Sequence, residues 1–540
     1  MKTINGQILK LMLISGSNNL YNHYPEIDAL NVFPVPDGDT GMNMNLTLTS
    51  GAKEIQNRSD TSVGDIAKVF SRGLLMGARG NSGVITSQIF RGFASELAGK
   101  EEINVVEFVS ALKRGSEVAY KAVVKPVEGT ILTVIRETSQ FLSSKVKSGM
   151  NFSTMFDLLL KEADTSLKHT PELLPILKEV GVVDSGGAGL IKIFEGMKAS
   201  LNGSLIERNL ATAMENEENE ELDKKEKSEY YIELLCNLKA GIKKKNFEET
   251  KFLNGLNSRG NEISIKLDDY LLKVHIHSFT PGNVINFVQQ YGEFETIKIE
   301  NLKNGLPISN LEVKQNKPKS KYAIIAVSSG KGIDDYFKTI GVNVIVKGGQ
   351  TMNPSAEDFL AAIKEANAEN IFILPNNSNI VMAASQACEV LEDDSVHAFV
   401  IPTKTIPQGI TAAISFNSEE TPEENFKEMK AALKHIKSGE VTFAIRDTEI
   451  NGVSVKKDDY IAIMEKSIVC SNKDLVDTTL TLIDRMVGDE DSIITVLVGE
   501  DVSNDDKEKI KKILVEKYED LDVDIVSGGQ PVYSFLIGVE

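Results

Sequence analysis

The sequence predicts a multidomain chain: an all-α helical domain, then a small α+β domain, then an α/β domain. In residues 1–203 the apolar side chains recur at helical spacing, and strand signals are few. Residues 230–311 combine alternating strand patterns with helical stretches. Residues 322–540 alternate buried strands with helices, which is typical of a largely parallel sheet.

Two stretches of unusual composition separate these domains. Residues 204–229 include an acidic run with almost no apolar side chains, so we expect a flexible linker there. Residues 312–321 form a second linker, which is basic. A chain of 540 residues is too long for one hydrophobic core, and this favours separate domains.

The overall charge limits the classes of partner. Lys and Arg number 59 against 78 Asp and Glu, which gives a net charge of -19. Such a surface repels nucleic acid and anionic membranes, so we expect neither as a partner. The three scattered cysteines predict no disulfide framework and favour the cytoplasm. We expect no signal peptide and no integral membrane segment, because the first residues are typical of an amphipathic helix.

The most informative stretch is a loop that holds Asp37 and Asp39 on either side of one glycine. Prolines before it and Gly41 after it exclude a regular element. Two carboxylates held so close favour a cation between them, and oxygen ligands of this kind suit Mg²⁺. The helix that begins near Met42 adds backbone N–H groups that favour phosphate oxygens. A solvated turn is the alternative for an isolated Asp-Gly-Asp.

Three glycine-rich turns accompany this loop, at residues 73–83, 125–132 and 181–189. A turn of this kind before a helix exposes N–H groups to anions, although tight helix packing explains the glycines about as well. The first turn lacks the Lys-Ser/Thr ending of a Walker A loop. Within it, Arg79 either neutralises charge on a transferred phosphoryl group or forms a structural salt bridge, and the two interpretations are evenly balanced.

Two further groups of residues point to binding sites. His275 and His277 share one face of a predicted strand, and Cys236 lies on another. These three side chains suit Zn²⁺, while ordinary core or surface histidines are the alternative. In the α/β domain, loops such as 348–355 and 375–379 follow strands and carry small polar residues. The strand-end edge is where such sheets bind ligands.

The run LNVFPVPDGDTGMNMNLT at 30–47 resembles the signature of the DhaL domain, the nucleotide-binding half of dihydroxyacetone kinases. The form is that of the ATP-binding subunit of bacterial fatty acid kinases. The resemblance extends to the Cys and His-x-His pattern of the middle domain and to a DegV-like C-terminal region. It implies that Asp37 and Asp39 bind a pair of Mg²⁺ ions that hold ATP. Val32 replaces a third aspartate, so Asn31 or Asp28 would substitute for it.

The resemblance also implies a set of nucleotide-contacting residues. They are Thr40, Gly41, Met42, Asn43, Asn81, Ser82, Gly129, Thr130, Asp184, Ser185 and Gly186.

By the same resemblance, the chain is expected to be a kinase subunit that acts in lipid metabolism and phospholipid synthesis. It would transfer the γ-phosphoryl group of ATP to a fatty acid carboxylate held by a separate carrier of the DegV-like family, giving an acyl phosphate. The C-terminal domain would serve partner docking or dimerisation, with a lipid pocket left open. We expect a homodimer, the commonest oligomer. A dihydroxyacetone-type kinase acting on a small polyol and a non-catalytic ATP-binding scaffold are the alternatives.

Overall fold

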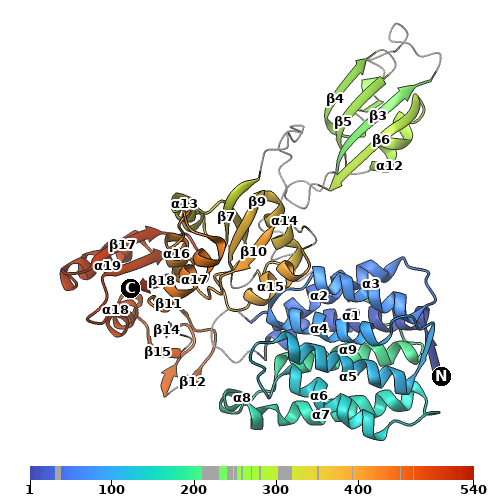
Figure 1. Ribbon diagram of the computed structural model, residues 1–540, viewed down its shortest axis with the longest axis horizontal. Helices are drawn as coiled ribbons and strands as arrows, with labels where there is room; N and C mark the ends of the chain where they lie inside the picture. The colour runs from blue at the N-terminus through green and yellow to red at the C-terminus, as the bar shows by residue number, and fades with distance from the viewer. Residues whose placement is uncertain are drawn as a thin grey trace. The chain divides into compact units, whose positions relative to one another are not determined.

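The computed structural model forms two compact units, and each is described by itself. One unit comprises Met1–Arg208 together with Lys319–Glu540, and the other comprises Asn209–Pro318 (Figure 1). The residues that the structure describes are 1–30, 38–209, 230–239, 247, 252–253, 255–256, 259–268, 271–278, 281–301, 319–349, 352–391, 393, 395–450, 452–465 and 467–540.

The N-terminal part of the first unit is helical, as predicted. One short antiparallel ribbon, β1 (Thr3–Asn5) with β2 (Glu102–Asn104), is added to the helices. The helices are α1 (Gly6–Asp28), α2 (Thr40–Gln56), α3 (Val63–Met76), α4 (Gly80–Glu96), α5 (Val105–Ala122), α6 (Ile131–Lys145), α7 (Phe152–Leu173), α8 (Pro175–Val180) and α9 (Ser185–Leu201).

Aromatic side chains form the centre of the helical core. Phe70, Phe90, Phe93 and Phe108 follow one another in edge-to-face contacts with ring centroids 5.2–6.1 Å apart. All four side chains are buried. Because they come from α3, α4 and α5, these rings join helices that are neighbours in sequence, and edge-to-face packing adds to the stabilisation from buried area.

Glycines allow α4 and α5 to cross closely. A Cβ atom at Gly92 would lie 2.6 Å from the carbonyl oxygen of Arg114, and one at Gly115 would lie 2.5 Å from the carbonyl oxygen of Ile89. Both distances are shorter than real Cβ contacts. The two backbones therefore touch at a point where no larger residue fits.

The C-terminal part of the first unit contains two main sheets. The first is parallel in the order β10-β9-β7-β8, and the second is mixed in the order β15-β14-β11-β18-β16-β17. Strands of the first are β7 (Ser320–Ser328), β8 (Val344–Lys347), β9 (Ala368–Leu374) and β10 (His397–Val400). Strands of the second are β11 (Lys437–Phe443), β14 (Tyr460–Met464), β15 (Ser467–Asn472), β16 (Ile493–Val498), β17 (Asp522–Ser527) and β18 (Phe535–Val539).

Helices accompany both sheets, and a small ribbon joins β12 (Thr448–Ile450) to β13 (Val453–Val455). The helices are α13 (Lys331–Thr339), α14 (Ala356–Ala366), α15 (Val381–Glu389), α16 (Ile406–Ile414), α17 (Pro422–Ala432), α18 (Leu475–Met486) and α19 (Asn504–Lys517).

The α/β class predicted for this region is confirmed, but the largely parallel character holds only for the first sheet. In the second sheet β16 and β17 are parallel, whereas β11, β14, β15 and β18 pair antiparallel with their neighbours. The connection from β14 to β15 is too short for a crossover helix, so these strands have to run in opposite directions.

The second unit is an α+β fold, as predicted. Its antiparallel sheet has the order β4-β5-β3-β6, with α12 (Pro281–Val288) contributing Val284 and Val288 to the core. The strands are β3 (Tyr230–Leu238), β4 (Asn261–Asp268), β5 (Leu271–Ser278) and β6 (Gly292–Asn301). Across the described parts of both units, no helix is long and apolar enough to cross a bilayer.

We expect Gly92→Ala to lower the stability of the helical part by about 1–3 kcal/mol, because α4 and α5 have to separate to admit the methyl group. This outcome opposes helix propensity, which favours alanine over glycine by about 1 kcal/mol. Thermal unfolding followed by circular dichroism measures the change. In the same unit, Gly488→Ala is a control whose Cβ would meet no atom closer than 3.5 Å. Equal melting temperatures for both variants would contradict the prediction.

Candidate functional site

Four helices of the first unit begin at one cavity. Asp39, Arg79, Thr130 and Asp184 are the N-cap residues of α2, α4, α6 and α9. The cavity has a volume of about 190 Å³ and is lined by Asp39, Thr40, Asn43, Asn81, Ser82, Ile85, Thr130, Ile131, Asp184, Ser185, Gly186 and Asn379. Helix N-termini carry partial positive charge and unsatisfied N–H groups, so this arrangement favours an anion such as a phosphate.

Two of the N-cap carboxylates play different parts. The carboxylate of Asp184 caps α9 by accepting a hydrogen bond of 2.7 Å from the N–H of Gly187. Burial raises the pKa of Asp184 to about 6, because desolvation disfavours its charged form. The side chain of Asp39 does not cap α2 and instead accepts a hydrogen bond from Asn353 Nδ2. Asp39 is therefore the carboxylate placed for a ligand rather than for its own helix.

The glycine turn before α4 brings polar side chains next to α2. Gly80 has a φ of +59°, and a Cβ there would overlap the amide of Asn43. The adjacent Asn81 donates a hydrogen bond of 3.1 Å from Nδ2 to Asn379 Oδ1. Its Oδ1 is buried without a hydrogen-bond partner among the described residues. A buried acceptor without a partner is costly, so this oxygen marks a place for a bound group.

The donor set fits a hard cation. Asp39 supplies a carboxylate, Asn81 an unpartnered amide oxygen, and Thr40 and Ser82 supply hydroxyl groups. Oxygen donors of these kinds, together with water and phosphate, are those that Mg²⁺ accepts. Among the residues that the structure describes, no three His, Cys, Asp or Glu side chains form a metal-binding group. Asp37 and Asn31, both predicted as ligands, lie outside the described residues.

The structure brings together most of the residues predicted to contact nucleotide. Thr40, Asn43, Asn81, Ser82, Thr130, Asp184, Ser185 and Gly186 all line the cavity. Their assignment to nucleotide stays a prediction.

Three predicted contacts have other backbone partners. The N–H groups of Gly41 and Met42 donate to Asp28 Oδ1 at 2.6 and 3.3 Å. The N–H of Gly129 donates to Thr133 Oγ1 at 2.8 Å. Asp28, considered as a substitute metal ligand, therefore caps the first turn of α2.

The structure favours the structural interpretation of Arg79. Its Nη1 donates to the carbonyl oxygen of Asn353 at 2.7 Å and lies 3.4 Å from Asp358 Oδ2. Sequence reasoning missed Asn353 and Asn379, which reach the helical part from the C-terminal part. Both lie in loops that the sequence singles out as strand-end loops, but nothing in the sequence pairs those loops with Asp39.

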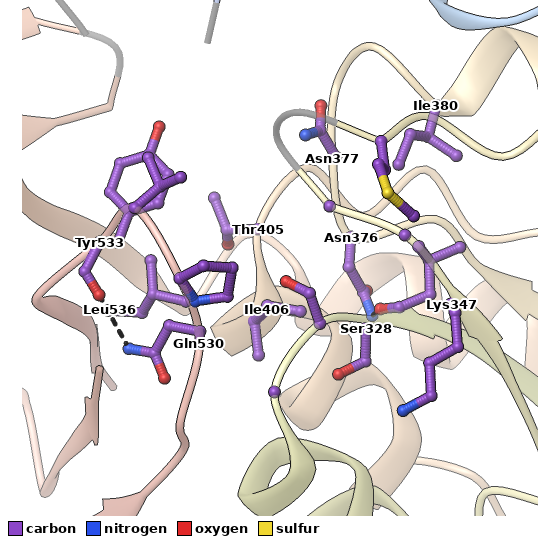
Figure 2. Close-up of a pocket in the computed structure, with 18 of the residues that line it drawn as sticks. Ser328, Lys347, Asn376, Asn377, Ile380, Thr405, Ile406, Gln530, Tyr533 and Leu536 are labelled. Carbon is purple, nitrogen blue, oxygen red and sulfur yellow. Dashed lines mark hydrogen bonds between the residues drawn. The ribbon is translucent and has the colours of Figure 1, made fainter. Parts of the chain in front are cut away.

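The C-terminal part has a second cavity, of about 400 Å³, beside the carboxyl ends of the parallel strands (Figure 2). Ser328, Asn376 and Gln530 give it a polar side, while Ile406 and Leu536 are apolar. Within the described chain, Ser328 Oγ and Gln530 Oε1 are buried without hydrogen-bond partners. The strand-end edge is therefore hollowed and holds unsatisfied polar atoms.

The zinc site predicted from Cys236, His275 and His277 is wrong in its geometry. Cys236 belongs to the buried face of the sheet with Leu234, whereas His275 and His277 lie on the opposite face of β5. Both histidine rings contact Tyr231 there, and Tyr231 Oη lies 2.6 Å from His275 Nδ1. The period of two places the histidines together, as predicted, but it turns the thiol away from them.

Comparisons with known proteins identify every domain of the chain. The DAK2 domain model matches residues 34–199. The FakA-like middle-domain and C-terminal models, both of fatty acid kinase, match residues 227–306 and 323–540.

Full-length relatives are similar throughout. Protein YloV of Bacillus subtilis (strain 168) is 42% identical over 555 residues, covering 100% of both chains. The uncharacterized protein SAR1202 of Staphylococcus aureus (strain MRSA252) is 41% identical over 547 residues, covering 99% of each. Among solved structures, the Streptococcus pneumoniae Fatty Acid Kinase (Fak) B3 protein loaded with linoleic acid is 14% identical. It covers 41% of this chain and 99% of that chain, with a TM-score of 0.29 that supports no inference here.

We expect Asp28→Asn to stabilise the protein at pH 8. Burial is the main reason that the pKa of Asp28 is raised from 3.8 to about 7. A raised carboxyl pKa gives stability that is complete below pH 3.8 and is lost as the pH rises through about 7. An asparagine can keep the hydrogen bonds from Gly41 and Met42 without the cost of ionisation.

The gain at pH 8 should be about 2–4 kcal/mol and should nearly vanish at pH 4. Thermal unfolding in EDTA at both pH values measures it. Asp164→Asn, which breaks an exposed ion pair with Lys168, is the control and should change stability by less than about 0.5 kcal/mol. A gain of equal size at both pH values would show that burial of the charge is not its cause.

Proposed function

Because the chain belongs to the FakA-like family of fatty acid kinase proteins, we propose that it transfers the γ-phosphoryl group of ATP to a fatty acid carboxylate. The fatty acid is presented by a separate carrier protein of the DegV-like family. The new bond joins a carboxylate oxygen to the γ-phosphorus. The bond from that phosphorus to the bridging oxygen breaks, and ADP leaves with the electron pair. The products are an acyl phosphate and ADP, in the cytoplasm and at the start of lipid synthesis.

The observation that carries this proposal is the meeting of four helix N-termini around Asp39. Phosphoryl transfer needs positioning and charge neutralisation more than covalent catalysis. Backbone N–H groups at the starts of α4 and α9 would bind phosphate oxygens, and the hydroxyl groups of Thr40 and Ser82 would orient them. Asp184 keeps the start of α9 in place through its cap.

Asp39, with Asp37 beside it in sequence, would hold Mg²⁺, which supplies positive charge to the phosphate oxygens. The remaining residues act on orientation and on access of water. Thr130 and Gly186 form part of the cavity wall next to Asp184, and no larger polar group stands there to compete with a nucleotide among the lining residues that the structure describes.

A separate carrier fits the charge of the chain. Its net charge of -19 repels anionic membranes, so a fatty acid would arrive bound to another protein. The carrier would dock on this chain with the fatty acid carboxylate directed at the cavity around Asp39. A symmetric homodimer would allow two carriers per assembly.

Carrier-dependent ADP formation tests the proposal. We expect wild-type protein to form ADP from Mg²⁺-ATP only when a fatty-acid-loaded carrier is added. Asp39→Ala should lower this rate by about 10²–10³-fold, because the metal loses a charged ligand. The control Asp164→Ala removes a carboxylate in an exposed pair on α7 and should leave the rate unchanged.

Two other outcomes would overturn the proposal. ADP formation driven by a small polyol without carrier would identify a dihydroxyacetone-type kinase. Tight binding of nucleotide with no turnover under any acceptor would identify an ATP-binding scaffold.

A further inference from the structure

The loop between β8 and α14 reaches the candidate site from the C-terminal part of the chain. Asn353 lies in this loop, and its residue is only 3% exposed. Its Nδ2 donates to Asp39 Oδ2 and, at 3.3 Å, to Asn43 Oδ1. The amide therefore touches the carboxylate around which the site is built.

We propose that Asn353 is a positioning residue that orients the carboxylate of Asp39 for a divalent cation. The C-terminal domain would then be a required part of the kinase site. This inference rests on the proposed nucleotide site and adds a residue that lies 314 positions away from Asp39 in sequence. It assigns Asn353 no contact with the substrate, because the side chain acts through Asp39.

The hydrogen-bond pattern fixes the orientation of this amide. The reverse orientation would place Asn353 Oδ1 against the carboxylate, where two acceptors repel each other. With Nδ2 on Asp39 Oδ2, rotation of the carboxylate is restricted, and this sets the direction from which its oxygens can meet a metal. Hydrogen bonds of this kind to a ligating carboxylate tune metal affinity by about 10–100-fold.

The loop itself is held firmly in place. Arg79 and Ser355 form an isolated antiparallel bridge, and Arg79 Nη1 donates to the Asn353 carbonyl at 2.7 Å. On the other side of Asn353, Ser355 and Asp358 form a capping box that starts α14. A side chain whose backbone is restrained on both sides loses little freedom when it binds Asp39.

A second loop of the C-terminal part makes a parallel contact. Asn379 follows β9, lines the cavity and accepts the hydrogen bond from Asn81. Apolar contacts support both loops, since Ala78 and Val84 at the start of α4 belong to one buried cluster with Ala383 and Ala384 of α15. The helical and C-terminal parts thus share a packed core beside the cavity.

A neutral amide distinguishes positioning from blockage. An inhibitory plug would neutralise Asp39 with a lysine or arginine, which would compete directly with the cation. Asn353 leaves the negative charge in place, and the cavity of about 190 Å³ stays open beside it with Asn379 in its wall. The C-terminal part therefore forms one side of the site without filling it.

Metal dependence of nucleotide binding tests this proposal without any acceptor. A fluorescent ATP analogue is titrated with Mg²⁺ in the presence of the full-length protein, and direct Mn²⁺ binding is measured by electron paramagnetic resonance. For Asn353→Ala we expect the half-saturating metal concentration to rise by about 10-fold or more. Nucleotide binding at saturating metal should return close to the wild-type level. Asn353→Ser, whose hydroxyl is too short to reach Asp39, should behave in the same way.

The control is Asn370→Ala, which removes an exposed asparagine hydrogen bond to the carbonyl of Lys321 in the same domain. It should leave metal dependence unchanged. Unchanged metal dependence in both Asn353 variants would overturn the proposal, and tighter binding would show that the loop is an inhibitory plug. Weaker nucleotide binding at every metal concentration would show a purely structural role. Because no acyl transfer is measured, these results stand apart from failure of the proposed kinase reaction.

Discussion

The start of four helices at a single cavity is the constraint on which the candidate site depends. Each helix brings unsatisfied N–H groups, and their partial positive charges add in the same small volume. Asp184 offsets this charge at α9, where it also satisfies the N–H of Gly187. Asp39 gives no cap to α2, so its charge is directed to the cavity. The site is thus prepared for an anion and a cation together.

Close backbone packing makes this convergence possible. Gly92 and Gly115 let α4 and α5 touch, and Gly80 lets the turn before α4 approach Asn43. At Gly80 the left-handed φ of +59° adds a conformational requirement to the steric one. Packing and anion binding are therefore not competing explanations for the glycine-rich turn at residues 73–83. The close approach of backbone to side chain is the means by which Asn81 and Ser82 reach the cavity.

Local sequence patterns predict what depends on neighbouring residues. Helical spacing gives the all-α region, and the Asp-Gly-Asp loop followed by a helix places Asp39 at a helix N-terminus. The patterns fail where the outcome depends on pairing between distant segments. Direction of the strands in the second sheet follows from hairpins formed at β11, β14 and β15. Cys236 and His275 lie on adjacent strands, but only the register decides that they face opposite sides.

The contact of Asn353 with Asp39 is of the same distant kind, and the structure shows why it lies where it does. Strand-end loops present successive side chains in different directions. In the first loop Met352 lines the C-terminal cavity while Asn353 turns to Asp39. In the second, Asn377 faces that cavity and accepts a hydrogen bond of 2.7 Å from the N–H of Asn379, whose side chain meets Asn81. Each loop therefore forms a wall of two cavities at once. A change in loop geometry at one cavity has to alter the other, because the side chains that serve the two cavities are neighbours or near neighbours along the chain.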